Sequence, residues 1–196
     1  MVNSNMKIGI LALQGSVIEH QRMLKRCNVE PVLIKKPKDM EGISGLIIPG
    51  GESTTIGKLI ELHGLDKAIK WYTESAGLPV YGTCAGAILL AKYILGSKQP
   101  SLSLMDISIK RNDYGRQVDS FETALDIEGF QKPFKGIFIR APVIEEIHDG
   151  VKIMSTFNNK PVLARQRNLL VSTFHPELTK DRRVHQYFID MINDRF

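Results

Sequence analysis

Residues 79–91 read PVYGTCAGAILLA, a short apolar run followed by a cysteine between two glycines and a second apolar run. A strand that turns abruptly into a helix strains the backbone at its apex and crowds the residues on either side. Gly82 and Gly86 have no side chain that would collide there. The stretch therefore predicts a nucleophile elbow with Cys84 at its apex, where unpaired N–H groups of the helix favour a thiolate. Taken alone, the pattern also fits a small residue buried at a tight turn.

The sequence around this elbow alternates between strand-like and helix-like segments. We expect strands at 7–13, 31–34, 45–49 and 79–81, and helices at 16–26, 55–63, 66–75 and 85–95. Such alternation predicts a parallel sheet covered on both faces, with the elbow at the carboxyl end of a strand, where these sheets hold their sites. The second half contains closely spaced strand candidates at 105–111, 120–127, 136–140, 151–157, 160–165 and 169–174, and a last helix at 181–193.

Length and composition are consistent with one compact domain. The chain has 196 residues, 43% of them hydrophobic, which is enough to build a single core. We expect one domain over residues 1–196, with residues 1–5 as a frayed extension ahead of the first strand. Because there are only two cysteines and no apolar run long enough to span a bilayer, we predict a cytoplasmic protein with reduced thiols. Cys27 is expected to be a small packed or half-exposed residue without a chemical role.

A second motif supplies a base for Cys84. Residues 169–174, LLVSTF, indicate a buried strand that runs into His175-Pro176-Glu177. Residues two apart in an extended chain point to the same side, so the Glu177 carboxylate can orient the His175 ring. The free ring nitrogen can then take the Cys84 proton. Taken alone, His175 also fits a histidine that is hydrogen-bonded at a strand end, and Glu177 fits a solvated carboxylate in a loop. Together with the elbow, the two residues predict a Cys-His-Glu triad.

A glycine-rich loop supplies a candidate oxyanion hole. Residues 45–55 read GLIIPGGESTT, an apolar strand that ends in a Gly-Gly pair. The two glycines let backbone N–H groups approach a ligand closely. We predict that the N–H of Gly51 and that of Ala85, just after the nucleophile, bind the developing oxyanion. A helix cap at Ser53 or Thr54 is compatible with this role.

The remaining charged residues and histidines indicate no further ligand. The net charge is +5, but the basic clusters at 35–38 and 180–183 are short, contain proline or acid and lack aromatic neighbours. Solvated surface is the leading interpretation, and docking on an acidic partner is the second. The other histidines (His20, His63, His148 and His185) lack zinc-ligand spacing, and no glycine-rich phosphate loop is present. We therefore predict no metal, no cofactor, and no nucleic-acid or membrane partner.

Several motifs, spread over nearly the whole chain, resemble those of one known family. They are residues 9–15 (GILALQG), 49–55 (PGGESTT), 82–86 (GTCAG), 111–117 (RNDYGRQ), 138–142 (FIRAP) and 174–178 (FHPEL). The elbow and the His-Pro-Glu motif are similar to those of many class I glutamine amidotransferases. The other motifs resemble one branch, the PdxT/SNO family of glutaminase subunits of pyridoxal 5′-phosphate synthase. The resemblance implies a single-domain, three-layer, flavodoxin-like α/β fold, with a mostly parallel sheet and helices on both faces.

The same resemblance implies a reaction and a partner. L-Glutamine is hydrolysed to L-glutamate and ammonia through a thioester on Cys84, and the ammonia passes to a synthase subunit of the PdxS/SNZ type. His175 protonates the leaving ammonia and then activates water. By the family match, the glutamine-binding residues are Gly51, Glu52, Ser53, Arg111, Ile139 and Arg140. Gln14 lies in the segment that resembles the partner-contacting region; the alternative is an ordinary polar residue before a glycine turn.

Three other interpretations stay open. Another amidotransferase branch, serving histidine, anthranilate or nucleotide synthesis, keeps the triad but lacks the motifs at 13–15 and 111–117. A stand-alone cysteine hydrolase, such as a peptidase or a γ-glutamyl hydrolase, works without a partner. A silent binding subunit only senses glutamine, and the complete triad argues against it.

Overall fold

The computed structural model describes residues 6–111 and 120–194, so residues 112–117 of the RNDYGRQ motif and the expected extension at 1–5 lie outside it. Its centre is a seven-stranded sheet with the order β10-β11-β12-β4-β3-β1-β2. These strands are β1 (Lys7–Leu11), β2 (Glu30–Ile34), β3 (Gly45–Ile48), β4 (Val80–Thr83), β10 (Lys152–Phe157), β11 (Lys160–Gln166) and β12 (Leu169–Ser172). All neighbours from β12 to β2 pair in parallel, and β10 and β11 add an antiparallel edge. The prediction of a mostly parallel sheet is confirmed.

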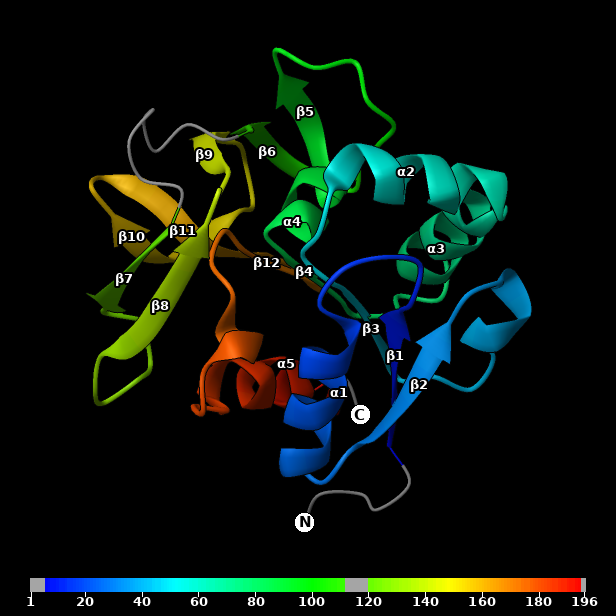
Figure 1. Cartoon of the computed structure of the whole chain (residues 1–196), viewed down its shortest axis with the longest axis horizontal. Helices are drawn as coiled ribbons and strands as arrows, with labels where there is room; N and C mark the ends of the chain where they lie inside the picture. Colours follow the sequence, from blue (N-terminus) through cyan, green and yellow to red (C-terminus); the bar gives the residue numbers. More distant parts are fainter. Residues whose placement is uncertain (1–5, 112–119, 195–196) are drawn as a thin grey trace.

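Helices cover both faces of this sheet, as predicted (Figure 1). On one face lie α1 (Val17–Arg26) and α5 (Arg183–Asn193); on the other lie α2 (Ser53–Leu62), α3 (Leu65–Glu74) and α4 (Ala85–Leu90). Two short 3-10 helices, η1 (Pro37–Met40) and η2 (Pro176–Leu178), occupy connections. None of the helices within the described residues is long and apolar enough to cross a membrane.

The sheet divides the hydrophobic core into two clusters. Successive strand side chains point to opposite faces, so Leu46 and Ile48 of β3 pack with α2, α3 and α4, whereas Ile47 packs with α1 and α5. The same alternation separates Val80 from Tyr81 on β4. The expectation of a single core was therefore wrong, because a sheet covered on both faces buries apolar side chains on each.

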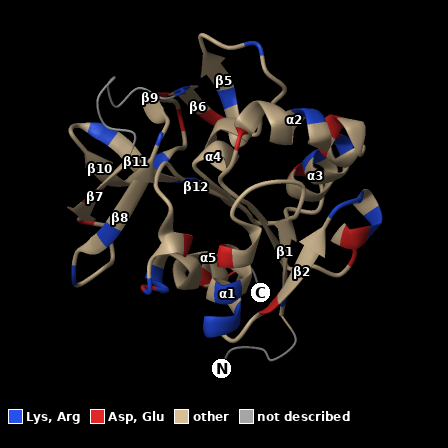
Figure 2. Cartoon of the chain, viewed as in Figure 1, with Lys and Arg blue, Asp and Glu red and all other residues tan. Residues whose placement is uncertain are grey.

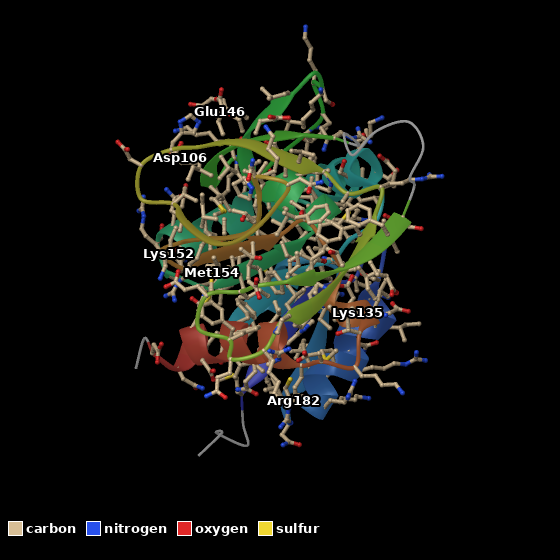
Figure 3. All side chains as sticks on the ribbon, turned by 90° about the vertical axis from the view of Figure 1, so that its left-hand side faces the viewer. Asp106, Lys135, Glu146, Lys152, Met154 and Arg182 are labelled. Carbon is tan, nitrogen blue, oxygen red and sulfur yellow. The ribbon has the colours of Figure 1, made fainter. Side chains whose placement is uncertain are left out.

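Additional strands form two smaller sheets beside the main one. They are β5 (Ala91–Leu95), β6 (Met105–Lys110) and β9 (Val143–Ile147) in one sheet, and β7 (Ser120–Leu125) and β8 (Phe134–Ile139) in the other. Figure 3 shows Asp106 of β6 and Glu146 of β9 above Lys135 of β8, so the two small sheets lie at different heights. The strands β7 and β8 pair antiparallel, and β8 matters for the site because the backbone N–H of His175 donates to Ile137 O of β8 at 2.8 Å.

One element prediction was wrong, and one strand was missed. The helix expected at 85–95 ends at Leu90; Ala91 has extended backbone angles (φ −62°, ψ 141°) and begins β5, which pairs in parallel with β6. The apolar run fits helix or strand equally well, and pairing with a distant strand decides between them. The segment β9 was not predicted at all.

Basic residues are distributed over several elements rather than gathered on one face (Figure 2). Cys27 is buried, and burial raises the pKa of its thiol. Within residues 6–111 and 120–194, no group of three or more His, Cys, Asp or Glu side chains is arranged to hold a metal ion.

Candidate active site

The predicted elbow is present between β4 and α4. Cys84 has φ 47° and ψ −101°, an unusual backbone conformation for a residue with a side chain. A Cβ at Gly82 would lie 2.5 Å from the carbonyl carbon of Gly86, and a Cβ at Gly86 would lie 2.0 Å from Ile48 O. Only glycine fits at these two positions, so the close packing of β3, β4 and α4 forces the turn that presents Cys84.

His175 and Glu177 lie beside the nucleophile. The His175 Nδ1–H donates to Glu177 Oε1 at 2.8 Å, and the Cys84 side chain lies close enough to the ring to raise the pKa of His175. Cys84 Sγ lies 3.9 Å from Ile139 O of β8. Both members of the His-Glu pair are buried. The geometry thus brings together a thiol, an imidazole and a carboxylate in the order that nucleophilic catalysis requires.

The pKa values of the pair favour the charged forms. Burial opposes a charge on His175, but hydrogen bonds to Cys84 and Glu177 outweigh it and raise the pKa of the imidazole. Burial likewise opposes ionisation of Glu177, yet the nearby His20 and His175 and the Ser16 hydrogen bond lower its pKa to about 2. Glu177 therefore stays an anion that stabilises a protonated His175.

A cavity of about 480 Å³ opens in front of Cys84. Its lining contains Cys84 and His175, together with Gly51, Glu52, Ser53, Ala85, Arg111, Ile139 and Arg140. Every residue predicted to bind glutamine thus faces the same space as the nucleophile, at the carboxyl ends of the central strands. Glu177 lies behind His175 and does not line the cavity.

Arg111 is anchored at the rim of this cavity. Its guanidinium donates to Glu52 Oε1 at 3.0 Å, to Thr54 Oγ1 at 2.9 Å and to Gln99 Oε1 at 2.9 Å. Glu52 is the N-cap of α2 and accepts from the backbone N–H of Thr54 and Thr55. The helix cap predicted at Ser53 or Thr54 is therefore wrong, because the longer glutamate side chain reaches the same N–H groups. Burial opposes ionisation of Glu52, but hydrogen bonds from Thr55 and Thr54 lower its pKa to about 2.

The loop before α2 is held from two sides. Gln14 Oε1 accepts the Glu52 N–H at 2.8 Å, so Gln14 touches the rim without lining the cavity. Gly50 donates its N–H to Thr83 Oγ1 at 3.0 Å, and its carbonyl oxygen accepts the Ser16 N–H at 3.0 Å. These contacts hold Gly51 beside the nucleophile.

Sequence reasoning missed several residues around the site. Ser16 Oγ donates to Glu177 Oε1 at 2.7 Å, and Gln99 Oε1 accepts from Ser53, Thr54 and Arg111. The histidine His20 was considered only as a metal ligand. None of these lies in a motif that indicates its contacts, since each partner is distant in sequence.

Comparisons with known proteins identify the family of this chain. Residues 10–194 match the model of the SNO glutamine amidotransferase family. The chain belongs to the SNO glutamine amidotransferase family. It is 51% identical to a Geobacillus kaustophilus protein named pyridoxal 5′-phosphate synthase subunit PdxT, over 96% of both chains. It is 50% identical to a Thermus thermophilus protein of the same name, over 94% of this chain and 96% of that protein.

Solved structures show the same fold. A crystal structure described as a glutamine amidotransferase superposes with a TM-score of 0.92 at 46% identity, covering 95% of this chain and 98% of that one. A putative GMP synthase component from Thermoplasma acidophilum superposes with a TM-score of 0.72 at 16% identity, covering 97% of this chain and 95% of that one. The class I glutamine amidotransferase fold predicted for this SNO family member is confirmed.

Proposed function

We propose that this chain is the glutaminase subunit of a pyridoxal 5′-phosphate synthase and hydrolyses L-glutamine to L-glutamate and ammonia. The observation that carries the proposal is the Cys84-His175-Glu177 arrangement at a cavity of about 480 Å³, in a chain 51% identical to a protein named as that subunit. Residues 1–196 act as one glutamine amidotransferase domain.

The proposed reaction has two halves. The Cys84 thiolate attacks the side-chain carbonyl carbon of glutamine, and the oxyanion that forms accepts hydrogen bonds from the N–H groups of Gly51 and Ala85. His175 gives its proton to the nitrogen as the C–N bond breaks, so ammonia leaves and a glutamyl thioester remains. His175 then takes a proton from water, whose oxygen attacks the thioester and releases glutamate and the Cys84 thiolate. Glu177 keeps the imidazole oriented throughout.

The rest of the cavity holds the amino-acid end of glutamine. Arg111 is a cation suited to the α-carboxylate. Its place beside Glu52 and Ser53 puts acceptors for the α-ammonium near that carboxylate. Ile139, the last residue of β8, and Arg140 also line the cavity; Arg140 has φ 43°, an uncommon value for a residue with a side chain.

The partner is a synthase subunit of the PdxS/SNZ type, which receives the ammonia. Docking completes the oxyanion hole by turning the Gly50–Gly51 peptide, because release of ammonia without the partner wastes it. Such a turn breaks the bond between Gly50 O and the Ser16 N–H. Gln14 couples docking of the partner to the glycine loop, because its side chain accepts a hydrogen bond from the Glu52 N–H. A chain that hydrolyses glutamine equally fast with and without the synthase contradicts this coupling.

The function is tested by mixing the chain with the synthase subunit, glutamine, a pentose phosphate and a triose phosphate. We expect glutamate release and pyridoxal phosphate formation, both abolished in Cys84→Ala. Glutaminase activity without cofactor product points instead to another amidotransferase branch. Full activity without the partner, on peptides or polyglutamates, indicates a stand-alone hydrolase. Undiminished ammonia release by Cys84→Ala rules out the mechanism.

A further inference from the structure

His20 of α1 is fully buried and has no role in the mechanism above. Its Nδ1 is 3.0 Å from Nε2 of His185 on α5. Its Nε2 is 3.2 Å from Thr83 Oγ1 and 3.6 Å from Glu177 Oε1. One imidazole therefore contacts both the residue before the nucleophile and the acid of the triad.

The positions of the protons follow from burial and from the unpaired atom of His185. Burial lowers the pKa of both His20 and His185, the latter to about 3, so both rings are neutral and each has one N–H. His185 Nδ1 is buried without a hydrogen-bond partner among the described residues. An unpaired buried acceptor is less costly than an unpaired buried N–H. His185 therefore donates from Nε2 to His20 Nδ1, and His20 has its own proton on Nε2, facing Thr83 and Glu177.

Thr83 extends this chain of contacts to the glycine loop, because its Oγ1 also accepts the Gly50 N–H at 3.0 Å. We propose that His20 is a positioning residue, which keeps Glu177, Thr83 and the Gly50 loop in their places around Cys84. The Glu177 oxygen that orients His175 also accepts from Ser16 and lies nearest to His20. Loss of the His20 N–H lets both the triad acid and the loop of the oxyanion hole shift. This inference rests on the proposed glutaminase function.

The test compares His20→Met with His20→Gln in the complex with the synthase subunit. Methionine fills the space without an N–H, whereas the glutamine amide places a donor near the position of Nε2. We expect kcat for glutamate release to fall ~10- to 100-fold in His20→Met, because a misplacement of about 1 Å in the catalytic groups has an effect of this size. KM for glutamine should change less than about threefold, and His20→Gln should recover most of kcat. A purely structural role predicts equal losses in both variants.

Thr83 gives a second pair that tests the same contacts. Thr83→Val removes the hydroxyl at nearly constant shape and should lower kcat at least ~10-fold, while Thr83→Ser should retain most of it. Thr73→Val is the matched control, because the buried Thr73 hydroxyl donates to Ile69 O within α3 and Thr73 does not line the cavity in front of Cys84. If His20→Met does not fold, as judged by circular dichroism, the Thr83 pair decides.

Several results overturn the proposal. One is a kcat equal to that of the wild type in His20→Met or in Thr83→Val. Another is an equal loss of kcat in His20→Met and His20→Gln, and a third is a change in KM for glutamine without a change in kcat. If the wild-type complex itself releases no glutamate, the proposed function fails together with the inference. An active wild type with an unaffected His20→Met refutes the positioning role alone.

Discussion

The substitution Gly50→Ala should show that the position of the catalytic base affects kcat independently of the stability of the protein. A Cβ at Gly50 would lie 2.5 Å from Cε1 and 3.0 Å from Nδ1 of the His175 ring. Carbon atoms in contact prefer ~3.5–4.0 Å, so the ring or the loop must move by about 1 Å. The ring is held by Glu177, and the backbone N–H of His175 is held by Ile137 O. The new methyl group therefore displaces the base from Cys84 or the loop from the oxyanion.

A displacement of about 1 Å in a catalytic constellation costs on the order of 100-fold in rate. We expect kcat for glutamate release by the complex to fall by about this factor, which corresponds to about 2.7 kcal/mol in activation free energy. The assay is steady-state glutamate release at saturating glutamine, with unfolding followed in parallel by thermal melting.

Gly42→Ala is the matched control for this prediction. No heavy atom of the described part of the chain lies within 4 Å of a Cβ built at Gly42, whose φ of +75° imposes only backbone strain. That strain amounts to about 1–2 kcal/mol and should lower Tm by a few degrees, about 2–4 °C per kcal/mol, without changing kcat. A Gly50→Ala enzyme with kcat within threefold of wild type would refute the reasoning, as would an equal loss of kcat in Gly42→Ala.

Three further predictions follow from contacts at the rim and in the core. Arg111→Met removes a cation from the cavity rim, so KM for glutamine should rise ~10- to 100-fold in steady-state kinetics; an effect on kcat alone contradicts the binding role. Gln14→Ala should reduce the ratio of glutaminase rates with and without the synthase, and an unchanged ratio excludes the coupling role. The pKa of His185 is lowered from 6.5 to about 3, so between these pH values the unfolded chain binds a proton that the folded chain does not. Stability therefore falls as pH falls, by at most about 1.4 kcal/mol per pH unit from this group. Between pH 6.5 and 5, the free energy of urea unfolding should fall less steeply with falling pH in His185→Gln than in the wild type. Equal pH slopes in the two proteins contradict a lowered pKa of His185.

Local motifs predicted the elbow and the His-Glu pair because their geometry depends on close neighbours in the chain. Cys84 has the strained backbone that its flanking glycines indicated, and Glu177 meets His175 two residues away. Where the local pattern was ambiguous, prediction was less successful. The apolar run after Cys84 fits a helix up to residue 95, but pairing with β6 turns it into a strand at Ala91.

By itself, the sequence determined the alternating order of the first strands and helices, the nucleophile and the partner of its base, because each follows from spacing within a few residues. Only the tertiary structure decided which polar groups surround the triad. His20 and His185 lie 165 residues apart in sequence, and Arg111 and Glu52 lie 59 apart. Such contacts depend on how helices pack over a sheet. The burial that results also changes the chemistry of the buried groups: it holds His185 neutral, whereas the protonated His175 and the hydrogen bonds from His175 and Ser16 keep Glu177 ionised.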